Sequence, residues 1–384
     1  MRKTAVPALD KLIKVAGELN NSYLKKAKNA GKKIVGIMCD EIPEEILMAA
    51  GCVPVLLRGT GADGTEYAEA YFRPLTCNYT RCTFNQILSG AWDFLDGAVI
   101  FNSCDHMRRV YDNWQLLPEN KAYHFIYAPK KGGNLSREFY REEVRKFVAA
   151  TEKKFGVEIT SEKISEAIRL QNEIRKLQQR LYELQKGKAV YLTGAELLMV
   201  MLAGVSMPRE DYLELLKELL EQLKASGETF TPEVRLLYTG GHADSREFFD
   251  MLETNGAQIV TDAALYGSDV CEVLVSEDGD PLVAVSDYYF EQKPASPRKF
   301  GTAKDRMERL DRLVKEFSVD GVVMIRVSSC DVWAAEQYMA RDHLQQTGVP
   351  FLELEVDYLP EGQQGQLSTR VQAFVESINA KKAE

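Results

Sequence analysis

Two separate stretches of the chain carry short apolar segments of strand length, and segments of helical pattern alternate with them. Uninterrupted apolar strands that alternate with helices are typical of parallel sheets covered on both faces. The sequence therefore predicts an α/β fold with a parallel sheet in each stretch. The expected strands lie at 33–38, 53–57, 97–101 and 123–127 in the first stretch, and at 234–238, 258–261, 321–327 and 351–356 in the second.

A charged, strongly helical segment separates the two stretches. Thr160 or Ser161 is suited to cap a helix whose apolar positions run from Ile164 to Leu181, and 210–223 forms a second amphipathic pattern. A regulatory coiled coil is an alternative, although the repeat is short for one. The predicted domains are an α/β domain at 1–136, a helical connecting region at 137–230 and a second α/β domain at 231–384.

Charge and hydropathy limit the partners of the chain. There are 48 Lys and Arg against 57 Asp and Glu, and the net charge of −9 argues against a nucleic-acid partner. No segment approaches the roughly 18 apolar residues of a membrane helix, and the Lys-rich segment 1–15 lacks the apolar core of a secretion signal. We therefore expect no membrane partner and a cytoplasmic location, where thiols stay reduced.

The two α/β stretches share an internal sequence repeat. Asp96-Gly97, an apolar run and Ser103-Cys104-Asp105 recur as Asp320-Gly321, an apolar run and Ser329-Cys330-Asp331. Another predicted strand ends at Cys39-Asp40. Because ligands bind beyond the carboxyl ends of strands in open parallel sheets, Cys104 and Cys330 are expected to meet if the two domains face one another.

Thiolates that converge from separate strands suit a soft metal centre such as an iron–sulfur cluster. A cluster with three protein thiolates leaves one iron open to bind a substrate oxygen or to pass an electron. Zinc is a weaker candidate because none of the seven cysteines forms a C-x-x-C pair. By strand position, Cys39 is the third candidate ligand beside Cys104 and Cys330.

The alternative is that the cysteines only fill space, since free cysteine is among the most buried residue types. The repeated Ser-Cys-Asp pattern weakens that alternative for Cys104 and Cys330. Cys52 and Cys271 lie in apolar surroundings and are expected in the core, and Cys82 on a helix face. If packing explains every cysteine, the chain is a metal-free α/β ligand-binding or scaffold protein.

Two candidates lie outside the cysteines. His106 follows Cys104-Asp105 and is a candidate acid–base group, with a partly exposed helix residue as the plainer interpretation. Thr239-Gly240-Gly241-His242 follows a predicted strand and either cradles a phosphate at a helix N-terminus or forms a tight turn.

Several motifs resemble a known family in their order and spacing. They are Arg73-Pro74-Leu75-Thr76-Cys77, Asp93-Phe94-Leu95-Asp96-Gly97, Asn102-Ser103-Cys104-Asp105-His106-Met107-Arg108-Arg109 and Gly365-Gln366-Leu367-Ser368-Thr369-Arg370-Val371-Gln372-Ala373-Phe374. Together they resemble subunits of the 2-hydroxyacyl-CoA dehydratase and benzoyl-CoA reductase family, of the 2-hydroxyglutaryl-CoA dehydratase D-component type. The resemblance extends from about Lys33 to Ile378.

The resemblance implies that Cys77, Cys104 and Cys330 hold one [4Fe–4S] cluster between flavodoxin-like or Rossmann-like halves. It also implies a heterodimer with a related second subunit (a homodimer is the alternative) and an ATP-hydrolysing iron–sulfur activator that supplies an electron. Such dehydratases are lyases that remove water from a 2-hydroxyacyl-CoA through a ketyl radical, whereas the reductases reduce an aromatic acyl-CoA. The resemblance thus favours Cys77 as third ligand where strand position favours Cys39.

The chain departs from the catalytic subunits of the dehydratases at two positions. Asp40 stands where they have a hydroxyl residue and Arg58 where they have a carboxylate, and 56–61 is more similar to the electron-relaying partner subunit. We therefore expect the partner's cluster to bind substrate. Arg58 stays protonated and cannot serve as a base, but it can pair with a carboxylate or a CoA phosphate across the interface. Asp40 is the candidate base of this chain.

One branch of the family uses additional cysteines to hold a double cubane and acts as an ATP-dependent reductase of small molecules. Seven cysteines allow six ligands, but the additional ones do not stand where that branch has them. The double cubane is therefore kept as an alternative to the single cluster.

Overall fold

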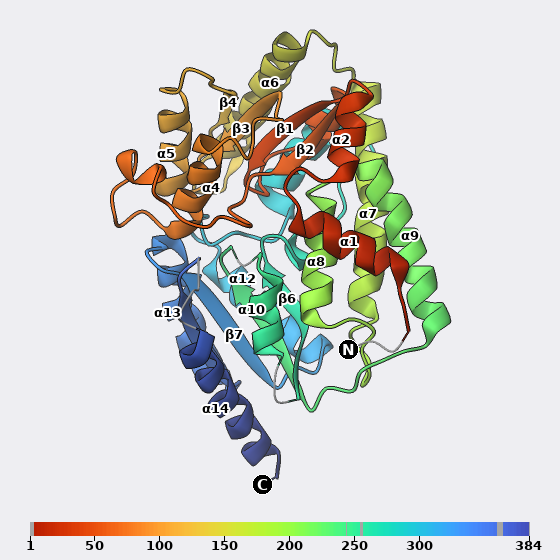
Figure 1. Ribbon diagram of the computed structural model, residues 1–384, viewed down its shortest axis with the longest axis vertical. Coiled ribbons are helices and arrows are strands. Elements are labelled where there is room, and N and C mark those ends of the chain that lie inside the picture. Colours follow the sequence, from red (N-terminus) through yellow and green to blue (C-terminus); the bar gives the residue numbers. More distant parts are fainter. Residues whose placement is uncertain (1–3, 243, 254–255, 359–363, 384) are drawn as a thin grey trace.

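Two four-stranded sheets lie one above the other in the computed structural model, which describes residues 4–242, 244–253, 256–358 and 364–383 (Figure 1). All strand pairs in both sheets are parallel. The predicted α/β class with a parallel sheet in each half is therefore confirmed. The strands are β1 (Lys33–Met38), β2 (Cys52–Leu56), β3 (Gly97–Phe101), β4 (Ala122–Ile126), β5 (Val234–Gly240), β6 (Ala257–Ala264), β7 (Gly321–Val327) and β8 (Phe351–Val356).

The two sheets have the same topology. Their strand orders are β2-β1-β3-β4 and β6-β5-β7-β8, each matching the first four strands of a flavodoxin-like sheet. In such a sheet the chain reverses its direction of winding between the first and third strands, and this point is where ligands bind. The carboxyl ends of β1 and β3, and of β5 and β7, are therefore the places to search for a site.

The Asp-Gly part of the internal repeat has a structural role. The Asp96 carboxylate accepts the backbone N–H of Ile34 at 2.9 Å, and the Asp320 carboxylate accepts that of Arg235 at 2.7 Å. Each aspartate thus ties the start of the third strand of its sheet to the start of the first. Equivalent positions in the two sheets explain why this part of the sequence repeats.

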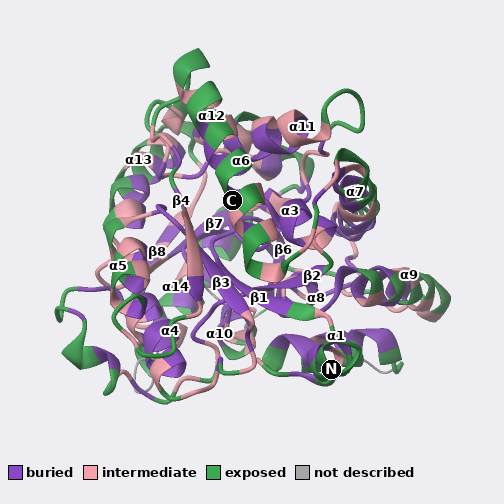
Figure 2. Cartoon of the chain, turned by 90° about the horizontal axis from the view of Figure 1, so that it is seen from above, coloured by how far each residue is buried: buried purple, intermediate pink, exposed green. Residues whose placement is uncertain are grey.

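Burial explains the apolar character of the strands. Every residue of β2, β3, β5 and β6 is buried, whereas the edge strand β8 alternates between buried and more exposed positions. Figure 2 shows the buried strands at the centre and the exposed residues mainly on the outer helices. A parallel strand covered on both faces is apolar throughout, and this holds even for the edge strands β2 and β6, because α3 packs against β2 and α8 against β6.

Helices cover the sheets and fill the space beside them. No helix among the described residues is long and apolar enough to cross a bilayer. The helices are α1 (Pro7–Gly17), α2 (Ser22–Asn29), α3 (Glu44–Ala49), α4 (Asn78–Leu88), α5 (Asp105–Trp114), α6 (Asn134–Phe155), α7 (Ser161–Glu183), α8 (Gly194–Gly204), α9 (Arg209–Ser226), α10 (Arg246–Leu252), α11 (Pro281–Asp287), α12 (Ala303–Glu316), α13 (Asp331–Thr347) and α14 (Gln364–Ala383), with the short helical turns η1 (Ala68–Ala70), η2 (Ser268–Val270) and η3 (Tyr288–Gln292).

The predicted helical segment joins the two sheets along one side of the molecule. Thr160 caps α7 by accepting the N–H of Lys163 at 3.3 Å, as its position in the sequence predicts. Helices α7, α8 and α9 pack together on the right of Figure 1, and α1 crosses α8 and α9. The connection is therefore a packed helical layer and not an isolated coiled coil.

One hydrophobic core is built from segments that lie far apart in the sequence. Val35 and Phe147 of the N-terminal half share a core with Val285 of α11 and Phe290 of η3, which follow β6. The segment after η3 thereby reaches the carboxyl end of β1. The domain boundaries at 136 and 230 stay a prediction. The segment after β6 brings residues of the C-terminal half into contact with residues of the N-terminal half.

A candidate three-cysteine site between the two sheets

Cys77, Cys104 and Cys330 line one cavity of about 380 Å³. Cys104 follows β3 and precedes α5, Cys330 follows β7 and precedes α13, and Cys77 precedes α4. Each of the three is the residue immediately before the first turn of its helix. The cavity thus lies where the carboxyl ends of the third strands of both sheets meet, as expected for Cys104 and Cys330.

The backbone around Cys330 is shaped to present its thiol. Ser329 has a φ of 64°, in the left-handed region that residues other than glycine rarely adopt. This conformation turns the chain sharply between β7 and α13. Burial raises the pKa of the Cys330 thiol, and backbone N–H groups of Val332 and Trp333 act against that rise. Helix N-termini favour negative charge, so each of the three positions suits a thiolate.

Cys77 is the most enclosed of the three cysteines. Burial raises the pKa of its thiol to about 12, and a negative charge on Cys104 or Cys330 adds to this rise. The thiol also lies 3.2 Å from the hydroxyl of Thr80 in the first turn of α4. Three thiols whose charges oppose one another need cations, either a metal centre or basic side chains, before all three become thiolates.

Two basic side chains line the same cavity, Lys130 and Arg298. Lys130 donates to the backbone carbonyl of Ser103 at 2.9 Å, which fixes the loop before Cys104. Burial lowers the pKa of Lys130, because the charged ammonium is partly removed from water. Arg298 is 8 % exposed and contacts the Cys39 thiol at 3.7 Å. The cavity therefore combines three thiols with two cations.

The structure brings His106 to the cavity as well. Its Nδ1 atom accepts the backbone N–H of Cys77 at 3.3 Å, so His106 connects the start of α5 to the start of α4. Burial lowers the pKa of the imidazole. In this geometry His106 holds the Cys77 loop, and its role as an acid–base group stays a prediction.

His242 forms another wall of the cavity together with Tyr79. Their rings stack at a centroid distance of 3.7 Å, and His242 Nδ1 lies 2.7 Å from the hydroxyl of Tyr266. Gly240, just before, has a φ of 139°, and a Cβ there would lie 2.1 Å from the carbonyl oxygen of Ile325. Gly240 is thus the last residue of β5, lets this strand approach β7 closely and places His242 at the cavity, while the phosphate cradle stays a prediction.

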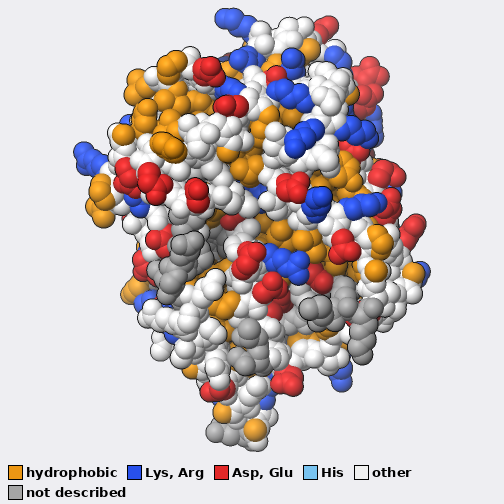
Figure 3. Space-filling view, in the orientation of Figure 1, with side chains coloured by type: hydrophobic (Ala, Val, Ile, Leu, Met, Phe, Trp, Pro, Cys, Tyr) orange, Lys and Arg blue, Asp and Glu red, His pale blue; other side chains and the backbone are white. Residues whose placement is uncertain are grey.

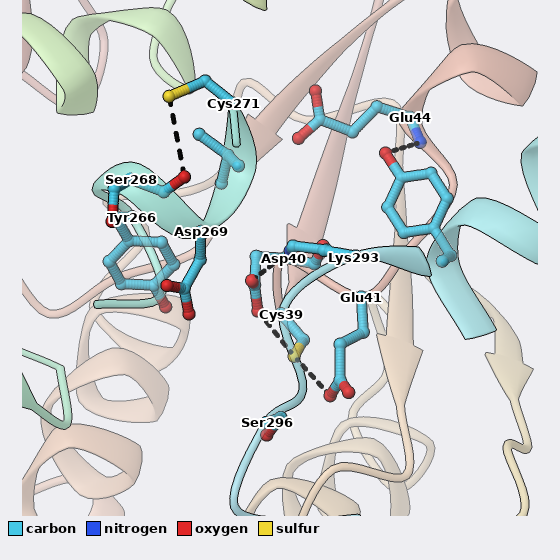
Figure 4. Close-up of polar contacts among 12 residues, drawn as sticks. Cys39, Asp40, Glu41, Glu44, Tyr266, Ser268, Asp269, Cys271, Lys293 and Ser296 are labelled. Atoms are coloured by element: carbon cyan, nitrogen blue, oxygen red, sulfur yellow. Dashed lines mark hydrogen bonds and ion pairs between the residues drawn. The ribbon is translucent and has the colours of Figure 1, made fainter. Parts of the chain in front are cut away.

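Cys39 and Asp40 lie behind this cavity, at the end of β1 (Figure 4). The Cys39 thiol contacts the carboxylates of Asp40 and Glu41, each at 3.4 Å. The Lys293 ammonium forms a buried ion pair with the Asp40 carboxylate and also donates to the Asp40 carbonyl at 2.7 Å. The structure does not bring Asp40 to the three cysteines, since its carboxylate faces Lys293.

The expectation for Arg58 is wrong. Its side chain is 1 % exposed and donates to the carbonyl of Ala16 and to the hydroxyl of Ser206, the latter at 3.1 Å. Arg58 therefore holds α1 and the end of α8 against β2 from inside the chain. A guanidinium buried there cannot pair with a CoA phosphate or with a carboxylate of another subunit.

The remaining cysteines are buried core residues. Cys52 begins β2, Cys82 lies within α4, and Cys271 follows η2. Within the described residues, no group of three or more Cys, His, Asp or Glu side chains is close enough to hold a single metal ion. Each thiolate of an iron–sulfur cluster binds a different iron atom, so cluster ligands lie further apart than the ligands of one ion.

One known family matches most of the chain. The family described as 2-hydroxyglutaryl-CoA dehydratase, D-component, matches residues 39–378. The chain belongs to this family. The match begins at Cys39 and includes Cys77, Cys104 and Cys330, and it ends within α14.

Proteins similar to this D-component chain are themselves parts of larger enzymes. The (R)-phenyllactyl-CoA dehydratase beta subunit of Clostridium sporogenes is 25% identical over 92% of this chain and 94% of its own length. A putative dehydratase subunit of Escherichia coli strain K12, YjiM, is 29% identical over 98% of this chain and 99% of its own. A benzoyl-CoA reductase subunit of Thauera aromatica is 25% identical over 92% of both chains.

Sequence reasoning missed Lys130 and Arg298. Neither residue belongs to a helix or a strand, so no periodic pattern marks it. The only local signal for Arg298 is a basic residue after two prolines in 294–298, which is common in surface loops. Only the folded D-component chain shows that this loop runs through the interior, beside Cys39.

Proposed function

We propose that this chain is a [4Fe–4S] subunit of a cytoplasmic 2-hydroxyacyl-CoA dehydratase, a lyase that removes water from its substrate. The observation that carries the proposal is the convergence of Cys77, Cys104 and Cys330 on one cavity, each at a helix N-terminus. Family membership and the named dehydratase subunits among the relatives support the same assignment.

The residues of the cavity fit such a cluster. Three thiolates would hold it, and the cavity of about 380 Å³ is lined largely by apolar atoms. Lys130 and Arg298 supply positive charge next to the thiols. A cluster of this kind supplies one-electron transfer when bound. The protein's own contribution is to hold the thiols apart at three helix ends, to exclude water and to balance negative charge.

A second subunit of the same family is the proposed partner. Large hydrophobic side chains are exposed beside the cavity: Leu75 is 79% exposed, Phe300 71% and Tyr338 70%. Leu75 precedes Cys77 by two residues, Phe300 lines the cavity, and Tyr338 lies one turn beyond the lining residue Ala335. Figure 3 shows hydrophobic side chains gathered over α5 as well. Exposed apolar side chains around a site are typical of a protein interface.

Within the complex, we assign this chain to electron relay and the partner to substrate binding. Asp40, the candidate base, is buried in an ion pair with Lys293 and does not line the cavity. A base must lie within hydrogen-bond reach of the proton that it removes. An ATP-hydrolysing iron–sulfur activator would supply the electron to this cluster.

Reduction of an aromatic acyl-CoA is the second candidate function. The benzoyl-CoA reductase subunit of Thauera aromatica matches 92% of this chain. The cavity geometry serves both reactions because each begins with one-electron transfer. The two functions are distinguished by which acyl-CoA the assembled complex converts.

The test is anaerobic purification of the chain, alone and with its second subunit. The chain alone should be brown and hold about four irons, as a single cluster requires. With the second subunit, activator and ATP, the complex should convert a 2-hydroxyacyl-CoA to the 2-enoyl-CoA. A colourless chain without iron contradicts the cluster, and turnover of only aromatic acyl-CoA thioesters selects the reductase.

A further inference from the structure

Arg298 occupies a position that the proposed function leaves unexplained. Its guanidinium Nη1 lies 3.7 Å from the Cys39 thiol and 3.5 Å from the Glu41 carboxylate. The same side chain lines the cavity of Cys104 and Cys330 on its other side. Arg298 therefore stands between the end of β1 and the three-cysteine cavity.

One donor of this guanidinium has no acceptor. The Nε–H of Arg298 is buried and lacks a hydrogen-bond partner within the described part of the chain. A buried, charged donor without an acceptor is costly, because it loses its hydrogen bonds to water and gains none. The neighbouring cavity is where an acceptor for it can lie.

The loop that carries Arg298 is anchored on both sides. Lys293 pairs with Asp40 at the end of β1, and the backbone N–H of Phe300 donates to the carbonyl of Lys130 at 2.7 Å. Within the loop, the backbone N–H of Arg298 donates to the hydroxyl of Ser296 at 3.3 Å. These contacts anchor the backbone of the loop, and the contacts with Cys39 and Glu41 orient the guanidinium.

We propose that Arg298 sets the reduction potential of the cluster that Cys77, Cys104 and Cys330 would hold. The inference rests on the proposed function. An oxidised [4Fe–4S] core with three thiolates carries one net negative charge, and uptake of one electron makes it two. A fixed positive charge and an N–H donor stabilise the more negative, reduced form more strongly. The electron comes from a low-potential one-electron reductant, and no bond is formed or broken.

Glu41 is the internal control for this idea. Its carboxylate shares the Arg298 guanidinium and partly cancels its charge. Removing the carboxylate should therefore favour the reduced cluster, while removing the guanidinium should disfavour it. Both substitutions break the same ion pair, so a purely structural effect would shift the potential in the same direction in both variants.

The experiment is a mediated redox titration of the anaerobic full-length chain with Ti(III) citrate, followed by electron paramagnetic resonance. At a given potential, Arg298→Gln should lower the ratio of reduced to oxidised cluster on the order of tenfold, or about 59 mV for a one-electron couple. Glu41→Gln should shift the potential upward, and Arg298→Lys should lie nearer the wild type because the charge remains.

Iron content separates failure of the cluster itself from failure of the role given to Arg298. A wild-type chain without iron contradicts the proposed function itself. If wild type and Arg298→Gln hold the same iron but have equal potentials, or if Arg298→Gln and Glu41→Gln shift in the same direction, the role of Arg298 is disproved. If Arg298→Gln does not retain iron, Glu41→Gln still decides, because an unchanged or lowered potential in that variant overturns the proposal.

Discussion

At the residue scale, the seven cysteines fall into groups that burial alone cannot separate. Cys39, Cys52 and Cys77 are all buried, yet only Cys77 of these lines the cavity with Cys104 and Cys330. The difference is the position of each backbone: the cavity cysteines precede helices, whereas Cys39 follows β1 and its thiol contacts the Arg298 guanidinium.

Substitution of single cysteines tests the ligand set. Cys77→Ala, Cys104→Ala and Cys330→Ala should each lose most of the iron, because each removes one of three protein thiolates. Iron per chain and visible absorbance after anaerobic purification are the measurements. Cys52→Ala is the control and should retain iron.

Cys39→Ala discriminates between strand position and the family resemblance. Its thiol faces Asp40 and Glu41 and does not line the cavity, so this variant should keep its iron. Loss of iron in Cys39→Ala together with retention in Cys77→Ala would reverse the assignment of the third ligand.

Asp40→Asn tests the role of the buried ion pair. Lys293 would lose its counter-charge while 5% exposed, so the free energy of unfolding should fall by about 3–5 kcal/mol in a urea titration. Asp40→Leu combined with Lys293→Met should recover much of this loss, since no charge stays buried. Glu308→Gln, at the exposed pair with Lys304, is the matched control and should change stability little.

At the element scale, α8 shows how burial can hide a helix. Every one of its residues from Gly194 to Gly204 is buried, so the segment has no polar face and no helical periodicity. The start of α8 is defined by Thr193, whose side chain forms a reciprocal capping box with Glu196. The half-buried Glu253 also accepts N–H groups at this helix start through its carboxylate.

Glu253 makes stability depend on pH. It accepts the N–H groups of Gly194, Ala195 and Ile259, but burial outweighs these hydrogen bonds and raises its pKa to about 7. Between its ordinary pKa and this raised value, the folded state binds more protons than the unfolded state. The contribution is therefore present at low pH and is lost as the pH rises through about 7.

The measurement compares the thermal midpoint of the wild type with that of Glu253→Gln at about pH 5 and about pH 8, on either side of the raised pKa. The wild type should lose stability relative to the variant between the two values, because only the wild type must release a buried proton or bury a charge. The variant has its own constant cost, since its amide cannot accept all three N–H groups, and this cost cancels in the comparison. A difference in Tm that is independent of pH would contradict the raised pKa.

At the scale of the whole molecule, the site depends on how the two sheets face one another. Neither half alone contains all three cysteines, because Cys77 and Cys104 belong to the first half and Cys330 to the second. Arg298, from the segment between β6 and β7, completes the cavity by crossing back to β1. Assembly of the site therefore follows the folding of the entire chain.

Charge substitutions at the mouth of the cavity test the proposed interface. Phe300→Asp and Tyr338→Asp should abolish co-purification with the second subunit, because each would bury an unpaired carboxylate in an apolar contact. Tyr67→Asp is the control: Tyr67 is 63% exposed, and its backbone N–H donates to the Asn85 side chain, toward the end of α4 opposite Cys77. Equal binding by all three variants would show that the second subunit docks elsewhere.

Turnover by the separated chain tests the division of roles. With activator, ATP and 2-hydroxyacyl-CoA substrates, this chain alone should be reduced but should form no enoyl-CoA, and addition of the second subunit should start product formation. Product formation by this chain alone, or its loss on Asp40→Asn with the iron intact, would place the chemistry at this chain's own site.

The sequence by itself determined the parallel sheets and the cysteines at their third strands. Local patterns suffice for these because burial on both faces demands apolar strands, and the Asp-Gly and Ser-Cys-Asp repeats mark equivalent strand ends. Only the tertiary structure decided that Cys77 and not Cys39 lines the cavity with Cys104. The Cys39 thiol, after β1, contacts the Arg298 guanidinium, a contact across 259 residues of sequence that no local pattern encodes.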